Sequence, residues 1–419
     1  MQESVLNHYI CKIEGHGDLK LNYKSGKATL KIEEGERLFE QLVLNRPYDD
    51  APFITARICG VCPTAHVLAS IGAIEDAFDI TVNERILSLR RALLAGQIIQ
   101  SHALHLFFLA APDYLDVVNA IELHHTKPEL YKTAIAMKKL GDKVVEVIGG
   151  RAIHPVAPAV GGFLSIPANE VLKELISELK GSLPMAMETA ELFASFKYPD
   201  ISRKTEYLMT QKDGKLTYID GDTIVSSNGF STPLENYGYA FSEKTREGST
   251  SKYGTRDNHG FMVGALARLS ISHDNLNPKA LYAYREIWGK QLPTYNSFHN
   301  NVAQAIEIVH LIEEAIAQLE VAIDNSKELA RVPFVVKAGA GVAAIEAPRG
   351  TLYHSVKLDK NGIITYYDIV TPTVQSLVNL EEDADEMMKQ YSKLPESELY
   401  KKVEMLIRAY DPCITCSVH

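Results

Sequence analysis

The last nine residues of the chain, Asp411–His419, read DPCITCSVH and place a CxxC pair at the C-terminus, with a histidine as the final residue. A second pair occurs far upstream in Arg57–His66, which reads RICGVCPTAH. The two pairs contain four of the five cysteines and lie about 350 residues apart. They can serve one metal centre only if the fold brings the two ends of the chain together. We therefore predict a fold that is organised around this meeting point.

The composition is that of an ordinary globular protein. The chain has 419 residues, of which 46% are hydrophobic and 23% charged, and it is long enough for a sizeable core. Its formal net charge of −10 and the lack of a basic cluster argue against nucleic acid as a partner. No apolar run reaches the roughly 18–20 residues of a membrane span, and Met1–Ser4 lacks the features of a signal peptide. We expect a cytoplasmic protein whose paired cysteines are metal ligands and not disulfides.

Periodicity along the chain predicts an α+β fold that is mostly helical. Apolar residues at three- and four-residue spacing predict a core of long helices and a helix before the C-terminal pair, at 83–109, 128–148, 169–194, 300–328 and 396–409. Strand-like alternation predicts an N-terminal hairpin within 8–34, a hairpin of 352–358 and 363–369, and a small β-containing insertion at 200–260. Since no linker separates these parts, residues 1–419 are expected to form a single domain.

Four cysteines in two pairs are compatible with several kinds of metal site. A structural zinc site usually draws its pairs from a short module, roughly 15–20 residues apart, so the long separation disfavours it. Neither pair has the βαβ context of a thioredoxin-like redox site. A four-cysteine iron–sulfur cluster and a site for soft metals such as nickel both fit, and spacing alone does not separate them.

Both cysteine motifs closely resemble the two signature motifs of nickel–iron hydrogenase large subunits. Four internal segments resemble further family segments in the family's order, namely 13–17 (IEGHG), 150–155 (GRAIHP), 261–268 (FMVGALAR) and 346–350 (EAPRG). The resemblance spans the whole chain apart from 200–260. It implies the catalytic subunit of an enzyme that cleaves dihydrogen reversibly and heterolytically into protons and electrons.

The resemblance also implies the ligands of the metal centre. Cys59, Cys62, Cys413 and Cys416 would all bind nickel, and Cys62 and Cys416 would also bridge to iron. The iron of this family carries carbon monoxide and two cyanide ligands, which no residue supplies. Dedicated metal-insertion proteins are therefore expected partners.

A second ion is implied near the C-terminus. Glu40, which lies nineteen residues before Cys59, the Ile369 carbonyl and His419 would hold a magnesium-type ion, although an imidazole is an unusual ligand for magnesium. Large subunits of this family are made with a C-terminal extension that a maturation protease removes after this histidine. A chain that ends at His419 resembles the processed form.

The resemblance assigns further roles around the metals. Glu14 would relay protons, although on its own the glycine-flanked segment is better explained by a simple bulge. Cys413 is the first candidate for the base, because an arginine such as Arg349 is almost always protonated and suits an electrostatic and positioning role beside Asp411. Three more residues would border the metals without binding them: His66, which is otherwise a core histidine, Pro348 and Thr373.

Two departures from the family pattern resemble its soluble, multi-subunit cytosolic branch. Ser101 stands where many membrane-linked relatives have an aspartate, and Val374–Ser376 where a tryptophan is expected. All paired cysteines are used, so electrons must leave through an iron–sulfur small subunit, with further flavin- or ferredoxin-type subunits expected. The alternatives are a dihydrogen sensor with the same ligands and an electron-transfer scaffold without nickel. The four retained cysteines argue against the scaffold.

Overall fold

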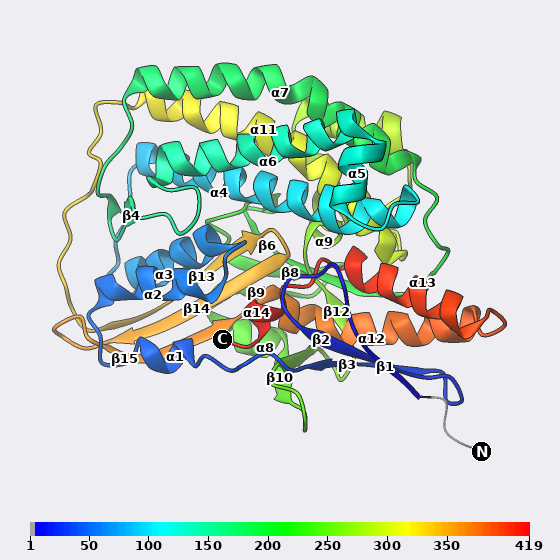
Figure 1. Ribbon diagram of the computed structural model, residues 1–419. Helices are drawn as coiled ribbons and strands as arrows, with labels where there is room; N and C mark the ends of the chain where they lie inside the picture. Colours follow the sequence, from blue (N-terminus) through cyan, green and yellow to red (C-terminus); the bar gives the residue numbers. More distant parts are fainter. Residues whose placement is uncertain (1–4) are drawn as a thin grey trace.

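The structure is a computed structural model that describes residues 5–419, so the four residues inspected for a signal peptide lie outside the described range. Four long helices lie side by side and form the bundle at the top of Figure 1. They are α4 (Glu84–Leu104), α6 (Pro128–Gly149), α7 (Asn169–Ser195) and α11 (Asn300–Asp324). Glycines bring α4 and α6 close together, because a Cβ on Gly96 would lie 2.6 Å from the Val144 side chain. The predicted helical core is confirmed, with boundaries within a few residues of those expected.

The central helix α4 continues through a π-helix (His105–Ala110) and a short 3-10 turn to Tyr114. By length and mean hydropathy, the span Glu84–Tyr114 is one helix that could cross a membrane, which the sequence did not lead us to expect. However, 83% of its apolar window is buried inside the molecule. It is packed as the core helix of the bundle, between α6 and α11.

A three-stranded antiparallel sheet lies below the bundle in Figure 1 and carries the turn next to the metal-binding motifs. Its strands are β13 (Gly339–Ala347), β14 (Gly350–Leu358) and β15 (Ile364–Val370). The predicted hairpin corresponds to β14 and β15, whereas β13 was missed because its sequence is rich in glycine and alanine, which have low strand propensity. These small residues let α3 (Pro63–Ala77) pack directly on β13, since a Cβ on Gly341 would lie 2.2 Å from the Ala73 carbonyl oxygen.

The N-terminal region forms a second antiparallel sheet of β1 (Val5–Tyr9), β2 (Gly17–Asn22) and β3 (Lys27–Ile32). The predicted hairpin is therefore present as β2 and β3, with β1 as an additional strand. The predicted insertion at 200–260 does contain β-structure, in β6 (Glu206–Lys212), β7 (Lys215–Leu216), β8 (Thr223–Ser226), β9 (Ser231–Pro233), β10 (Ser242–Thr245) and β11 (Lys252–Thr255).

Short elements connect these layers. The helices among them are α1 (Phe39–Leu42), α2 (Ala51–Thr55), α5 (Ala120–Thr126), α8 (Tyr237–Ala240), α9 (Ala265–Ser272) and α10 (Pro278–Tyr282). The strands are β4 (Pro158–Ala159), β5 (Gly162–Phe163) and β12 (Phe261–Met262), the last of which joins the sheet of β6.

The chain ends in three helices, α12 (Pro372–Gln390), α13 (Glu396–Ala409) and the short α14 (Ile414–Ser417). The backbone reverses at Asp411, whose φ of 52° lies in the left-handed region. Beyond it, Cys413 forms a parallel β-bridge with Glu14 in the loop between β1 and β2. The prediction that the two ends of the chain meet is therefore confirmed, and the fold class is the expected one.

Candidate metal centre

Four buried cysteine side chains meet at one point. All four sulfur atoms lie within 4.8 Å of one another. The Sγ–Sγ distances are 3.4 Å between Cys59 and Cys413, 3.2 Å between Cys62 and Cys416, and 2.9 Å between Cys413 and Cys416. A disulfide is only about 2.05 Å long, and all four thiols are free. Within residues 5–419 this is the one group of three or more His, Cys, Asp or Glu side chains found close enough to hold a metal ion.

Burial and hydrogen bonding between the sulfurs shift the pKa values of these thiols. Burial raises the pKa of Cys413 and Cys416 well above the ordinary thiol value, while hydrogen bonding with Cys413 lowers the pKa of Cys59. Four adjacent thiolates are too costly in a buried site without a cation. A metal cation deprotonates the thiols that coordinate it, and soft thiolates suit nickel and iron. The residues present therefore fit a metal centre with four thiolate ligands.

The first pair is placed by its own segment and by one neighbouring helix. The backbone amides of Val61 and Cys62 point at Cys59 Sγ, at 3.2 and 3.4 Å. Cys62 immediately precedes α3, which begins at Pro63. Gln97 of α4 accepts a hydrogen bond from the backbone amide of Ala65 at 2.9 Å and so fixes the first turn of α3.

The second pair is placed by residues that are distant in sequence. Thr373 Oγ1 accepts a hydrogen bond from the Cys413 amide at 2.9 Å. The Glu14 carbonyl accepts one from the Ile414 amide at 3.0 Å, and the Glu14 carboxylate binds both the amide, at 3.1 Å, and the hydroxyl of Thr415. Arg37 donates to the Thr415 carbonyl. Residues from other parts of the chain therefore help to seat this pair.

Gly15 is needed where the two chain ends cross. Its φ is +82°, and a Cβ there would lie 2.7 Å from the Ile414 Cβ. The glycines around Glu14, which the sequence left open as a bulge, therefore permit this close approach.

A buried arginine lies beside the cysteines. Arg349 Nε donates to the Asp411 carbonyl at 2.7 Å, and Nη2 donates to the Asp411 carboxylate at 2.9 Å. Ser101 Oγ lies 3.4 Å from Arg349 Nη1. Burial alone would lower the pKa of Arg349, but the charges of Asp411 and of the cysteine sulfurs hold it well above the ordinary value. Arg349 is therefore a fixed positive charge at the centre.

Asp411 is itself held by Gln304 of α11, whose Nε2 donates to the second carboxylate oxygen at 3.0 Å. The same glutamine contacts His105 through its Oε1. Gln304 was missed by the sequence analysis, since a buried glutamine in a long helix has no local motif.

A chain of neutral side chains supports the second pair. His66 Nε2 lies 3.8 Å from Cys416 Sγ, and its Nδ1 lies 3.2 Å from Nε2 of His354. His354 in turn contacts the Tyr367 hydroxyl at 2.8 Å. Burial lowers the pKa of His66 to about 3, so this imidazole is uncharged. His354 lies in β14 and has no motif that points to the metal centre.

A small cavity adjoins Cys62 and Cys416. Its wall contains Cys413, His66 and Arg349 in addition to these two cysteines. The rest of the wall is formed by four apolar residues and one residue with a hydroxyl, namely Ala347, Pro348, Leu352, Pro372 and Thr373. The wall thus combines apolar side chains with a hydroxyl, an imidazole and a guanidinium, and it leaves room only for small groups beside the cysteines.

The C-terminal histidine lies in a separate cluster. His419 Nε2 is 2.8 Å from the Ile369 carbonyl oxygen and 3.6 Å from a carboxylate oxygen of Glu40. Burial alone would raise the pKa of Glu40, but His419 and Lys252 lower it overall. The three residues predicted to hold a second ion are thus together, and their ligand role stays a prediction.

Comparison with known proteins gives the class of this chain. The family model for nickel-dependent hydrogenases matches residues 37–130 and 257–419. The chain is 36% identical to the alpha chain of sulfhydrogenase 1 from Pyrococcus furiosus, over 98% of this chain and 96% of that protein. It is 33% identical to a component of the F420-non-reducing hydrogenase vhu from Methanococcus voltae, over 89% of this chain and 95% of that protein.

Solved structures agree. A crystal structure of an NAD+-reducing NiFe-hydrogenase in the H2-reduced state matches 100% of both chains with a TM-score of 0.88 and 26% identity. The chain therefore belongs to the nickel-dependent hydrogenase family. Within that family it is the large, catalytic subunit of a nickel–iron hydrogenase, an oxidoreductase that acts on dihydrogen.

Proposed function

We propose that this protein cleaves dihydrogen reversibly and heterolytically at a nickel–iron centre held by the four cysteines. All four would bind nickel, and Cys62 and Cys416 would also bind an iron that carries carbon monoxide and two cyanide ligands. When bound, such a centre supplies the polarisation that separates dihydrogen into protons and electrons. The observation that supports this most is the convergence of four sulfur atoms within 4.8 Å. The small cavity beside Cys62 and Cys416 supports the iron assignment, because it leaves room for small groups on a metal.

The route of the proton follows from groups that lie in series. Cys413 is the proposed first acceptor. Its Sγ lies 3.9 Å from the Thr415 hydroxyl, which in turn contacts the Glu14 carboxylate. Glu14 is only half buried, whereas the cysteine is fully enclosed. A proton on Cys413 can therefore move outward through a hydroxyl to a carboxylate near the surface.

Arg349 and Asp411 are proposed to act by charge and position. A guanidinium whose pKa lies well above the ordinary value is a poor base, but it stabilises negative charge on nearby sulfur. Three neighbours are proposed to shape the centre from outside the ligand set: His66, through its contact with Cys416; Pro348, through the cavity wall; and Thr373, through its hydroxyl.

We propose that Glu40, the Ile369 carbonyl and His419 hold magnesium or a similar ion. Two oxygen ligands suit magnesium, and the imidazole is the unusual member of the set. Metal-insertion proteins and a maturation protease are proposed as further partners by analogy with the family.

The proposed partner subunits are those that would accept the electrons released from dihydrogen. The remaining cysteine, Cys11, lies exposed at the surface, so an iron–sulfur small subunit is proposed as the electron acceptor. Further flavin- or ferredoxin-type subunits are proposed by analogy with the multi-subunit relatives. A cytoplasmic location and a single domain over 1–419 stay predictions. One contiguous hydrophobic core that includes both Ile10 and Val418 supports the latter.

The test is dihydrogen-dependent reduction of an artificial dye by the matured complex. We expect rapid turnover in the parent and in Cys11→Ser, and none in Cys413→Ser. A very slow reaction in a nickel-loaded complex would instead identify a dihydrogen sensor.

A further inference from the structure

A second arginine is completely buried behind the turn that carries Arg349. Arg268 lies in α9, and its side chain has no exposed surface. Nε and Nη2 bind the two carboxylate oxygens of Glu307, at 2.6 and 2.7 Å. Nη1 binds Glu346 at 3.0 Å. Two buried carboxylates from different elements thus fix the plane of one guanidinium.

The two remaining N–H groups of Arg268 bind main-chain carbonyls. Nη1 donates to the Ala347 carbonyl at 3.0 Å, and Nη2 donates to the Pro348 carbonyl at 3.3 Å. Ala347 pairs with Gly350 where β13 turns into β14, so Pro348 and Arg349 form the tip of this hairpin. All five N–H donors of Arg268 are therefore used, and two of them hold the residues directly before Arg349.

The carboxylates are satisfied in turn by groups that anchor them to the scaffold. Glu307 also contacts His102 at 2.9 Å. Glu346 accepts hydrogen bonds from the amide of Thr210 at 2.8 Å and from the hydroxyl of Thr351 at 2.7 Å. Buried ion pairs of this kind are costly to form and costly to break, and they favour one geometry over others.

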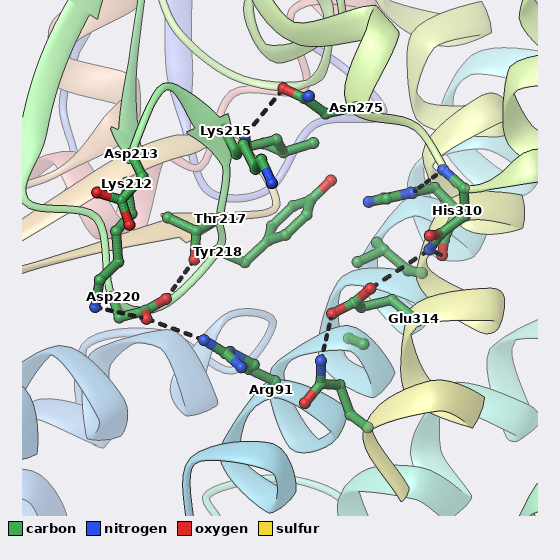
Figure 2. A pocket seen from close by; sticks show the side chains of 15 residues that line it. Arg91, Lys212, Asp213, Lys215, Thr217, Tyr218, Asp220, Asn275, His310 and Glu314 are labelled. Carbon is green, nitrogen blue, oxygen red and sulfur yellow. Dashed lines mark hydrogen bonds and ion pairs between the residues drawn. The ribbon is translucent and has the colours of Figure 1, made fainter. Parts of the chain in front are cut away.

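The network extends to Tyr218, a buried residue that borders a cavity. The Tyr218 hydroxyl lies 3.2 Å from Glu307, and its carbonyl accepts a hydrogen bond from the Glu346 amide at 2.9 Å. Its ring forms part of the wall of a polar cavity of about 300 Å³. Figure 2 shows this ring between the segment with Lys215 and Thr217 and the helix with His310. Tyr218 is thus the outermost member of the network, and it can be altered without cutting the ion pairs.

We infer that Arg268 is the positioning residue for Arg349. Its hydrogen bonds to the carbonyls of Ala347 and Pro348 hold the hairpin tip so that the Arg349 guanidinium faces the cysteines. Arg349 lines one small cavity with Cys62, Cys413 and Cys416, so a shift of the tip moves its charge relative to the sulfurs. The catalytic consequence rests on the proposed function, in which Arg349 is the cationic group at the metals. The positioning of Arg349 by Arg268 is independent of the proposed function.

The chain offers a matched control. Arg90 is also buried and binds both oxygens of Glu75, each at 2.7 Å, together with the Ala159 carbonyl at 3.1 Å. These partners lie far from the hairpin tip in the sequence, and none of them is among the described partners of Arg268. Arg90→Lys therefore breaks a buried ion pair whose described partners lie outside the network of Arg268.

The experiment compares Arg268→Lys with Arg90→Lys in the assembled enzyme. Lysine keeps the charge but cannot reach five acceptors from one nitrogen. In Arg268→Lys, we expect turnover to fall about 100-fold, as a misplacement near 1 Å can cause, with nickel content and the KM for dihydrogen unchanged. Backbone amides of 347–352 should exchange with deuterium faster. Arg90→Lys should retain parental turnover and parental exchange in this segment.

Three outcomes overturn the inference: parental exchange at 347–352 in Arg268→Lys, parental turnover in that variant, or the same changes in Arg90→Lys. If Arg268→Lys does not assemble, Tyr218→Phe decides. Loss of one hydrogen bond to Glu307 should lower turnover about fivefold and speed the deuterium exchange of backbone amides at 347–352. Unchanged amide exchange would contradict the inference. If the parent enzyme does not turn over dihydrogen, the proposed function fails, while the exchange comparison still tests the positioning.

Discussion

The two cysteine pairs reach the same point by different routes. Cys59 and Cys62 lie within a continuous segment, and the amides of that segment and the start of α3 place them. Cys413 and Cys416 lie in the C-terminal segment and are seated by Glu14, by Arg37 and by Thr373, which come from three distant segments. The first pair is thus set by local folding, whereas the second depends on completion of the tertiary structure. The second pair is therefore the half of the centre that is easier to disturb.

The largest effect is expected from substitutions that remove one cysteine ligand from either pair. Cys62→Ser and Cys416→Ser should both abolish nickel retention. Each should lower turnover by more than about 100-fold, because substitutions of residues that only contact the metal ligands already cost up to about 100-fold. Metal analysis and dye reduction measure both, and Cys11→Ser is the control. If either variant kept nickel and activity, the two pairs would not serve one centre.

The next effect should be specific to the second pair. Glu14→Gln should lower turnover on the order of 10²–10⁴-fold, since the carboxylate is the proposed proton carrier, while nickel content stays intact. Exchange between deuterium gas and water measures the proton step. Glu34→Gln, which changes another carboxylate of the same N-terminal region, is the control. Near-normal exchange in Glu14→Gln would refute the relay.

A milder change loosens each pair separately. Arg37→Ala removes a donor to the Thr415 carbonyl and should lower the opening free energy of residues 411–419 by about 1–3 kcal/mol. Gln97→Ala removes the acceptor of the Ala65 amide and should act only on residues 59–66. Hydrogen exchange resolved by segment measures both effects. Equal loosening of both segments by either variant would contradict the difference between the pairs.

The last effect concerns the bundle, away from both pairs, and should leave turnover unchanged. Burial lowers the pKa of His299 from its ordinary value of 6.5 to about 4. The unfolded chain therefore binds a proton that the folded chain rejects, and stability should fall as the pH drops from about 6.5 towards 4, by up to about 3 kcal/mol. Denaturant unfolding across this range should give a shallower pH dependence in His299→Gln. An unchanged slope would rule out this contribution.

The sequence predicted elements whose cause is local. The boundaries of α13 were predicted to the residue, because an amphipathic run follows Pro395 and ends before the reversal at Asp411. The meeting of the four cysteines was also anticipated, since each lies in a motif, whereas the roles of Glu14, Arg349 and His419 stay predictions. In contrast, β13 was missed, as its glycine- and alanine-rich sequence forms a strand only because α3 packs on it.

Residues that act through long-range contacts could not be predicted. Gln304 reaches Asp411 across 107 residues, and His354 reaches His66 across 288. Arg268 lies in a segment that resembles the family, but nothing in that segment indicates that it donates hydrogen bonds to the Ala347 and Pro348 carbonyls. Such roles depend on which elements pack together, and a single sequence carries no local signal for that.

The most direct test of the central claim is the infrared spectrum of the matured protein, recorded together with its nickel and iron content. If the two ends of the chain hold one nickel–iron centre, the protein should contain nickel and at least as much iron, and it should absorb in the regions of metal-bound carbon monoxide and cyanide. Both signals should disappear in Cys416→Ser. Properly matured protein without nickel and without these bands would contradict the account.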